Sequence, residues 1–450
     1  MRHRSDLKRI REAVTLYNSR RKSSQKFNLV GFVIEFSLPR KSQGTDYVTT
    51  IRVVDELLSE LFINMFAEKE EHLPHLKSYK DLIVLNNVMM KHYVDGDEIC
   101  AVYYKQTSSF ALFDVKTTTN TPYQTSPGFH LQKHDIPCIT SMRALSSRYE
   151  VSAGRNEYLM TIKDLGTKMF FDLVCQVLYV QKLEVGCMLF VWDGNDAPPL
   201  KVQTMHEDEE LSPLPLEIEA KTLNMLILSK FPCVGTVLRV KAPVDMSAYF
   251  QEEMGQWVKI RNMKCEETES GLWLGTLLPT TKVRLLPNSD PIVMECKRAM
   301  DERGVGRQGR SPLGSNPLSG LTVVDPKEFP YATLMDLITH TEIETIVRCV
   351  VRVVAISPSN LDSFLSQNEE CKIILTLEDP TARIHALLDS QHWGVFFEDF
   401  TSDDSDALKR MKMNKLLGCE RDHRNPPWIE CCIKSNGNRI YFICNTKLVP

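Results

Sequence analysis

Hydrophobic and polar positions alternate between Phe170 and Asn195, in the run FFDLVCQVLYVQKLEVGCMLFVWDGN. Apolar residues at every second position from Phe171 onward are typical of a β-strand with one buried face. Gly186 interrupts the alternation, and a second apolar run ends at Trp192. The Asp-Gly pair that follows is a common turn sequence. The segment therefore predicts two strands joined by a turn, with another turn after Trp192.

A weak repeat of roughly 140 residues occurs three times along the chain. Each copy has the order strand, loop, strand and Asp turn, and in the first and third copies a third strand follows. The first copy predicts strands at Asn28–Phe36, Thr45–Asp55 and Leu61–Phe66, and the third predicts them at Ile343–Ile356, Cys371–Glu378 and Ile384–Leu388. Gly31 lies inside the first of these strands, where a bent strand of a small barrel often carries glycine. Many OB-fold barrels begin with such a strand pair, and they commonly bind single-stranded nucleic acid across one face.

The chain is therefore expected to be mainly β, with tandem OB-fold barrels (three OB-like domains) and short flanking helices. Apolar spacing predicts helices at Leu7–Tyr17, Thr333–His340 and Ser405–Leu417. The run Asp301–Gly320 is rich in Gly, Pro, Arg and Ser and is typical of a linker. The predicted divisions are a basic extension at 1–25, OB folds at 26–150 and 155–290, a flexible linker at 291–324 and an OB-like domain at 325–450.

Composition adds bounds to this picture. A chain of 450 residues, 43% hydrophobic and 25% charged, is expected to hold two to four globular domains. The sequence has no apolar run of membrane-spanning length and no signal-peptide pattern near its first residue. Thirteen cysteines, an odd number without regular spacing, indicate reduced thiols in the nucleus or cytosol.

The net charge of −4 argues against binding to nucleic acid mainly through bulk charge. It leaves room for a binder that stacks a few bases and neutralises a few phosphates. The charge is uneven, because the first 26 residues are basic, whereas the stretches Glu207–Glu210 and Glu398–Asp406 are acidic.

Catalytic and metal-binding motifs are missing from the sequence. It contains no GxSxG, no GxxxxGK[ST], no HExxH and no CxxC. His72 and His75 are separated by Pro74, which makes a poor helix for metal ligands. We therefore expect no enzyme activity, no cofactor and no metal.

Aromatic residues on predicted strands are candidates for base stacking. Phe66, Tyr93 and Phe170 lie on or beside such strands, where a side chain can face a groove. The alternative is that each belongs to a barrel core, and the run LFINMF around Phe66 is apolar on both faces. Lys41, Thr45 and Asp46 lie in the loop and strand start where these barrels bind backbone and base edges, or simply form a solvated hairpin.

Several segments resemble the protection-of-telomeres family of telomeric single-strand end-binding proteins. They are QGTDYVTTIRVVD, MFFDLVCQVL, LFVWDG, VRLLP and PPWIECCIKS, in the family's order along nearly the whole chain. The length, and the SSFALF segment, look most like the shorter plant members.

The resemblance implies two N-terminal OB folds that hold G-rich telomeric single strands, and a C-terminal domain for protein contacts. By position it implies base and backbone contacts for Thr45 and Asp46, stacking for Phe66 and Tyr93, and in the second barrel a stacking Phe170 and a basic Arg284. Lys41, Lys91 and Lys241 complete the predicted DNA-binding set. Lys241 stands where animal members have a stacking tyrosine, Gln43 replaces a lysine, and the zinc-binding insertion is missing, so weaker DNA binding is expected.

Two functions remain open on the sequence. The first is a nuclear protein at chromosome ends that binds the single-stranded telomeric overhang, protects it and regulates telomerase access. The alternative is a protein of the same fold that contacts the telomerase ribonucleoprotein or other telomere-end proteins, with weak or no direct DNA binding. In both, the third domain binds protein and moves independently on its linker. Its aromatic residues Trp393, Phe396, Phe397 and Phe400 either form an exposed patch for a partner or belong to the core. Neither reading involves a membrane.

Overall fold

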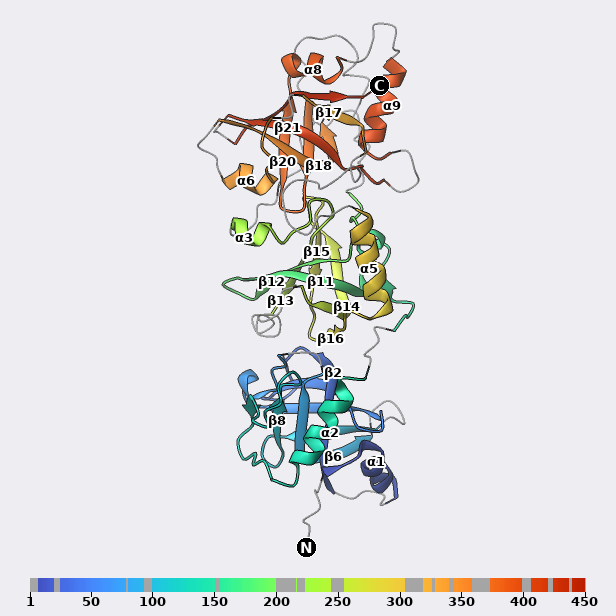
Figure 1. Ribbon diagram of the computed structural model, residues 1–450, viewed down its shortest axis with the longest axis vertical. Helices are drawn as coiled ribbons and strands as arrows, with labels where there is room; N and C mark the ends of the chain where they lie inside the picture. Colours follow the sequence, from blue (N-terminus) through green and yellow to red (C-terminus); the bar gives the residue numbers. More distant parts are fainter. Residues whose placement is uncertain are drawn as a thin grey trace.

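Three five-stranded β-barrels are stacked along the long axis of the molecule (Figure 1). The computed structural model describes residues 7–19, 25–77, 80–92, 99–149, 154–199, 216, 223–243, 255–303, 319–325, 328–339, 344–357, 373–398, 406–419, 424–436 and 439–449. The expectation of a mainly β chain of tandem OB-fold barrels is confirmed.

The strand pairings of the first barrel close into a ring. β2 pairs with β4, β4 with β5, β5 with β7, β7 with β6, and β6 returns to β2. The third and fifth strands pair in parallel and the other neighbours are antiparallel, which is the Greek-key order of an OB fold. The strands are β2 (Lys26–Ser37), β4 (Tyr47–Val54), β5 (Glu60–Ala67), β6 (Leu82–His92) and β7 (Ile99–Tyr104).

The other two barrels repeat this order, again with a parallel pair between the third and fifth strands. The second barrel consists of β11 (Phe170–Lys182), β12 (Cys187–Trp192), β13 (Leu238–Ala242), β14 (Trp257–Glu267) and β15 (Trp273–Thr276). The third consists of β18 (Thr345–Ser357), β19 (Ile373–Glu378), β20 (Arg383–Leu388), β21 (Ile429–Ser435) and β22 (Tyr441–Cys444).

The first strand of each barrel pairs with the fourth strand over its first half and with the second strand over its second half. Each of these strands is bulged near the change of partner, which gives the bend that closes a small barrel. In β2 the change occurs at Gly31–Phe32. A Cβ on Gly31 would lie 2.4 Å from Val53 Cγ1 and 2.5 Å from the Val54 carbonyl oxygen, so the close approach of β4 requires glycine.

Short elements flank the barrels. In the first two they are β1 (Leu7–Lys8), α1 (Ile10–Ser19), β3 (Arg40–Lys41), η1 (Glu70–His72), β8 (Ser109–Phe113), β9 (Gln124–Thr125), α2 (Ile136–Ser146), β10 (Leu159–Met160), η2 (Ile162–Asp164), α3 (Met225–Leu228), β16 (Lys282–Leu286) and α5 (Pro291–Glu302). In the third they are β17 (Thr322–Val324), α6 (Leu334–Thr339), α8 (Ser390–Phe396), α9 (Asp406–Leu416) and β23 (Thr446–Leu448).

The predicted helices correspond to α1, α6 and α9. The first part of the predicted linker was wrong, because residues from Pro291 to Glu302 form α5. This helix begins on a Pro after an Asp290 cap, and it buries Val293 and Cys296 against the second barrel. Residues 304–318, the centre of that linker, lie outside the described part of the chain. Among the described residues, no helix has the length and apolar character needed to span a membrane.

A buried aspartate directly follows the second strand of every barrel. Asp55, Asp193 and Asp379 are the three Asp turns that the sequence repeat contains. One carboxylate oxygen of each accepts the N–H of the first residue of the helix that precedes the barrel, from Ile10 at 2.7 Å, from Ile162 at 2.8 Å and from Leu334 at 2.8 Å. The other oxygen accepts N–H groups of the turn itself. The aspartate therefore ties the helix, the strand end and the turn together.

The first two barrels share one continuous sheet. β16 follows the second barrel and pairs antiparallel with both β14 and β2, so that Lys282 lies opposite Ser37 of the first barrel. The buried Glu35 of β2 reaches across this seam and accepts hydrogen bonds from Arg284 at 2.8 Å and Arg261 at 3.2 Å. Burial alone would raise the pKa of Glu35, but the two guanidinium groups hold it below its usual value.

Replacing Asp193 with alanine is expected to destabilise the second barrel. The change leaves the N–H groups of Ile162 and Asn195 without their acceptor, and each unsatisfied buried N–H costs about 1–3 kcal/mol. The free energy of unfolding from urea titration should fall by a few kcal/mol. Glu184→Ala, in the exposed turn of the same hairpin, is the matched control. Equal stability of the two variants would show that the Asp turn does not hold the barrel.

Candidate nucleic-acid interface

The outer face of the first barrel is set by the alternation of β4 and β5. On β5, Leu61, Ile63 and Met65 point into the core, so the residues between them point outward. Strand pairing arranges the outward side chains in three rows across β4, β5 and β7. The rows are Val48–Phe66–Tyr104, Thr50–Asn64–Val102 and Arg52–Phe62–Cys100.

Phe66 is one of these outward residues and is partly exposed. The core alternative for Phe66 is therefore wrong, because its neighbours Met65 and Ala67 occupy the interior. Its partner across the parallel pair is Tyr104, a residue that the sequence analysis did not select. The Nζ atom of Lys91 lies 5.3 Å from the centre of the Tyr104 ring. The structure thus brings a predicted aromatic residue and a predicted cation together around an additional aromatic ring.

The loop between the first two strands borders this face. Lys41 and Thr45 are exposed, and Asp46 accepts a hydrogen bond from Lys105 at 2.9 Å. Lys105 also bonds Glu68 at 2.9 Å, and these two bonds raise its pKa. Tyr93 directly follows β6 in the sequence and lies outside the described residues. The loop between the first two strands flanks the binding face of an OB fold.

In the second barrel the structure places Phe170 and Lys241 on one outward row. Phe170 lies opposite Lys264, Lys264 opposite Thr276, and Thr276 opposite Lys241. The side chain of Phe170 is 45% exposed and Lys241 is also exposed. Lys264, which bonds Glu266 at 2.7 Å, adds a further cation between them.

Arg284 lies away from this row, at the seam between the first two barrels. Its guanidinium donates to the buried Glu35, and its own side chain is 13% exposed. Its predicted role in DNA binding is untested, and the role that the geometry shows is the connection of two barrels.

The inner part of the second barrel's outward face is covered. Phe190, three residues before Asp193, lies opposite Arg239 near the start of β13. The equivalent pair in the first barrel is Arg52, three residues before Asp55, and Phe62 on β5. Phe190 is fully buried beneath Phe231, with ring centres 5.5 Å apart, and beneath Arg239. Arg239 donates to the Thr381 carbonyl of the third barrel at 3.2 Å. The third barrel therefore closes one end of this face.

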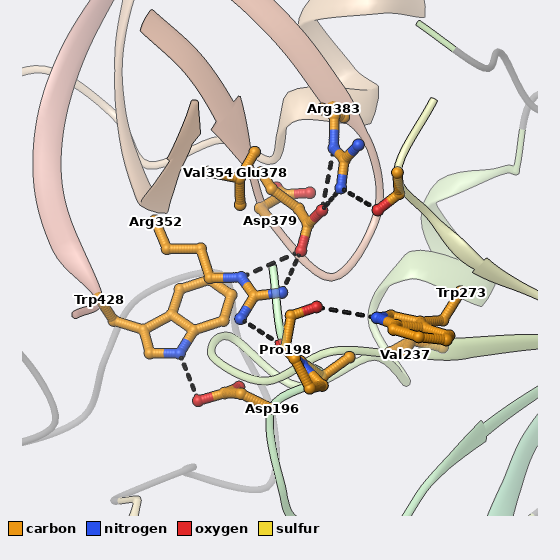
Figure 2. Close-up of polar contacts among 12 residues, drawn as sticks. Asp196, Pro198, Val237, Trp273, Arg352, Val354, Glu378, Asp379, Arg383 and Trp428 are labelled. Carbon is orange, nitrogen blue, oxygen red and sulfur yellow. Dashed lines mark hydrogen bonds and ion pairs between the residues drawn. The ribbon is translucent and has the colours of Figure 1, made fainter. Parts of the chain in front are cut away.

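The junction between the second and third barrels is polar and buried (Figure 2). Glu378 accepts hydrogen bonds from Arg352 at 2.6 Å and Arg383 at 2.5 Å, all within the third barrel. The same arginines donate to carbonyl oxygens of the second barrel, Arg352 to Ala197 at 2.9 Å and Arg383 to Ser270 at 2.5 Å. Figure 2 shows Glu378 between the two guanidinium groups, holding both toward the second barrel.

Trp428 extends this junction by donating to Asp196 at 3.1 Å. Its ring packs with Val234, which precedes β13 of the second barrel, and with Val350 of β18 in the third barrel. These contacts argue against the expectation that the third domain moves independently of the others, because buried hydrogen bonds join it to the second barrel. The movement itself stays a prediction.

The aromatic patch on the third domain was wrong, and the alternative that these residues belong to the core is confirmed for Phe396 and Phe397. Phe396 and Phe397 are buried in the core of the third barrel, and Trp393 packs partly buried against them. Phe400 lies outside the described residues. On β19, β20 and β22 the outward positions beyond the junction are Ile374, Leu387 and Phe442 in one row, and Thr376 and His385 in the next. The first row continues to Lys434 of β21, which lies opposite Phe442, and the row nearest the Asp turn is Glu378 and Arg383 of the junction.

Comparison with known proteins agrees with this arrangement. A family model described as telomeric single stranded DNA binding POT1/CDC13 matches residues 8–155, and one described as a POT1A-like OB fold domain matches residues 317–439. Protection of telomeres protein 1a of Arabidopsis thaliana is 31% identical, over 98% of this chain and 97% of its own length. The chain belongs to the protection of telomeres family.

A second family member from Arabidopsis thaliana, protection of telomeres protein 1b, is 32% identical over 91% of this chain and 89% of its own length. Among solved structures, fission yeast Pot1 with single-stranded DNA covers 66% of this chain and 93% of its own, at 15% identity and a TM-score of 0.26. A likeness this low adds no detail to the site.

The Glu378→Gln variant is expected to weaken the third barrel of this family member and its junction. Burial favours the protonated form, but Arg352 and Arg383 outweigh it and lower the Glu378 pKa to about 2. Removing one partner of a buried ionic group costs about 3–5 kcal/mol. Because the folded pKa lies below the unfolded value, the contribution of Glu378 is complete above about pH 5 and is lost as the pH falls toward 2.

The stability gap between wild type and Glu378→Gln, measured by urea unfolding, should therefore be large at pH 7 and smaller at pH 3. Burial has the opposite effect on the neighbouring Asp379, whose pKa rises to about 6, but both proteins retain that group. Glu266→Gln, an exposed glutamate paired with Lys264, is the control. A gap that is constant with pH would contradict the ionic role of Glu378.

Proposed function

We propose that this protein binds single-stranded, G-rich telomeric DNA through the outer face of its first barrel. The observation that carries the proposal is the cluster of Phe66, Tyr104 and Lys91, in which two adjacent aromatic rings and a cation face outward together. Bases stack on aromatic side chains, and lysine neutralises the phosphates between them. Membership of a family whose model is described by telomeric single-strand binding supports the choice of ligand.

Polar side chains beside the aromatic cluster are suited to reading base edges. Thr50 donates to Asn64 Oδ1 at 2.7 Å, and the Asn64 amide nitrogen donates one hydrogen to Cys100 Sγ at 3.9 Å. The second amide hydrogen of Asn64 would then serve a base. Thr45 and Asp46 border the same face on the loop before β4. Lys41 would belong to the rim of this face, and Tyr93, which lies outside the described residues, stays a sequence-based member of the site. The row from Phe170 through Lys264 to Lys241 would continue the binding surface on the second barrel.

The finer biological role belongs to the same proposal. Binding of the 3′ overhang in the nucleus would protect chromosome ends and limit telomerase access. The third barrel would contribute less to phosphate binding, because the outward residues of β19, β20 and β22 beyond the junction are apolar or uncharged. It would instead serve contacts with the telomerase ribonucleoprotein or other telomere-end proteins. The alternative, a protein-contact role with weak or no DNA binding, differs in one measurable quantity, the direct affinity for the G-rich strand.

Replacing Phe66 with alanine is expected to weaken binding of a G-rich telomeric oligonucleotide without unfolding the barrel. Loss of one stacked base costs about 1–3 kcal/mol, and the side chain lies outside the core. Tyr104→Ala should have a similar effect, measured by fluorescence anisotropy with labelled oligonucleotide. Phe110→Ala is the contrasting control, because this phenylalanine is buried in the core and its removal should cost about 3–5 kcal/mol of stability. Unchanged affinity of Phe66→Ala would refute the stacking role.

The G-rich strand, the C-rich strand, a scrambled strand and duplex DNA provide the direct test of the ligand. The full-length protein should prefer the G-rich single strand over the other three. A chain with net charge −4 should owe this preference mainly to stacking and base contacts, so its affinity should fall only modestly with salt. Equal affinity for the scrambled and telomeric strands would reject sequence-specific binding, and no affinity for any strand would favour the protein-contact alternative.

A further inference from the structure

Two cations from different barrels meet on one aromatic ring at the seam of the first two barrels. Phe62 projects outward from β5, and the guanidinium carbon of its cross-strand partner Arg52 lies 5.0 Å from the ring centre. The Nζ atom of Lys282, which β16 of the second barrel contributes, lies 4.8 Å from the same centre. An aromatic ring attracts cations at this distance, so Phe62 holds both in place.

The continuous sheet makes this meeting possible. Lys282 lies opposite Ser37 on β2, and β2 pairs with β4, where Ser37 accepts the Thr50 N–H at 2.8 Å. Lys282 therefore extends a row of outward side chains that begins with Asn64 and Thr50 on the first barrel. The cation from the second barrel reaches the first barrel's candidate DNA face because the two barrels share strand pairing there.

Positive charges outnumber negative charges in the network of ion pairs at the seam. Its five cations are Arg52, Lys259, Arg261, Lys282 and Arg284, and its three carboxylates are Glu35, Glu60 and Asp172. Glu35 and Asp172 are buried within the seam, whereas the side chains of Arg52 and Arg261 remain 27% and 37% exposed. A locally positive seam on a chain of net charge −4 is suited to an anionic ligand.

We propose that Lys282 and Arg52, positioned by Phe62, form a clamp for a backbone phosphate where a bound single strand passes from the first barrel to the second. Phe62 and Phe66 lie on the same face of β5, four residues and about 13 Å apart. A strand whose bases stack on Phe66 and Tyr104 thus has the clamp at one end of its path. The clamp would bind the phosphate charge and would not distinguish between bases. It rests on the proposed function for its ligand, and it adds a contact that joins the two barrels.

The test is the salt dependence of binding by the full-length protein, with a G-rich telomeric oligonucleotide and a polythymidine of equal length. Removing one phosphate contact on a single strand should reduce the slope of log affinity against log salt by roughly 0.7 to 1. Lys282→Gln should show this reduction with both oligonucleotides and should weaken binding several-fold at low salt. Lys282→Arg keeps the charge and should retain the wild-type slope.

Lys163→Gln, an exposed lysine in η2 of the same barrel, is the matched control and should leave the slope unchanged. Phe62→Leu keeps both charges but removes the ring, so the effect of Lys282→Gln should shrink in that background. Thermal melting shows whether each variant is folded, and Lys282→Met offers a second neutral variant. A wild-type slope in a folded, neutral Lys282 variant would overturn the clamp. Failure of the wild type to prefer the telomeric strand would instead overturn the proposed function, while the slope on polythymidine would still report on the clamp.

Discussion

The buried aspartate at the end of each second strand is the interaction on which the rest of the structure depends. Asp55, Asp193 and Asp379 each bind the N-terminus of a short helix with one oxygen and their own turn with the other. A carboxylate buried in this way is costly unless its oxygens are hydrogen-bonded. These bonds therefore fix where the second strand ends. Since side chains alternate along a strand, fixing its end also fixes which residues face the core and which face outward.

Once the register is fixed, three barrels of one topology acquire different outward chemistry. The outward residue three positions before the aspartate forms a cross-strand pair in each barrel. The pairs are Arg52 with Phe62 in the first barrel, Phe190 with Arg239 in the second and Thr376 with His385 in the third. The first two pairs are the same cation and aromatic ring in exchanged positions. In the first barrel both members of this pair are partly exposed, whereas in the second barrel Phe190 is fully buried and Arg239 bonds the third barrel. The fold thus repeats, and exposure distinguishes the sites.

Sequence patterns predict the strands well because alternation and the Asp turns are local properties. Residues close together in the chain are enough to predict the strands around Asp55, Asp193 and Asp379. They are also enough to select Phe66 as a candidate for an outward position. Tyr104 could have been found in the same way, since it follows Val102 at strand spacing in ICAVYY. Lys282 could not, because its role depends on β16 pairing with a strand roughly 245 residues earlier. The sequence left open whether Phe396 and Phe397 are exposed or buried for a similar reason, since a run of aromatic residues does not show which element covers it.

The two seams between barrels use the same device, one buried carboxylate shared by two arginines. Glu35 binds Arg261 and Arg284, and Glu378 binds Arg352 and Arg383. At the first seam the ionic group itself spans the two barrels. At the second seam the carboxylate and its arginines belong to one barrel, and the spare guanidinium N–H groups bind carbonyl oxygens of the other. Such groups gain little net stability over apolar packing, but they are satisfied in few arrangements. They therefore favour one relative placement of the barrels, which the proposed binding surface across the first seam would require.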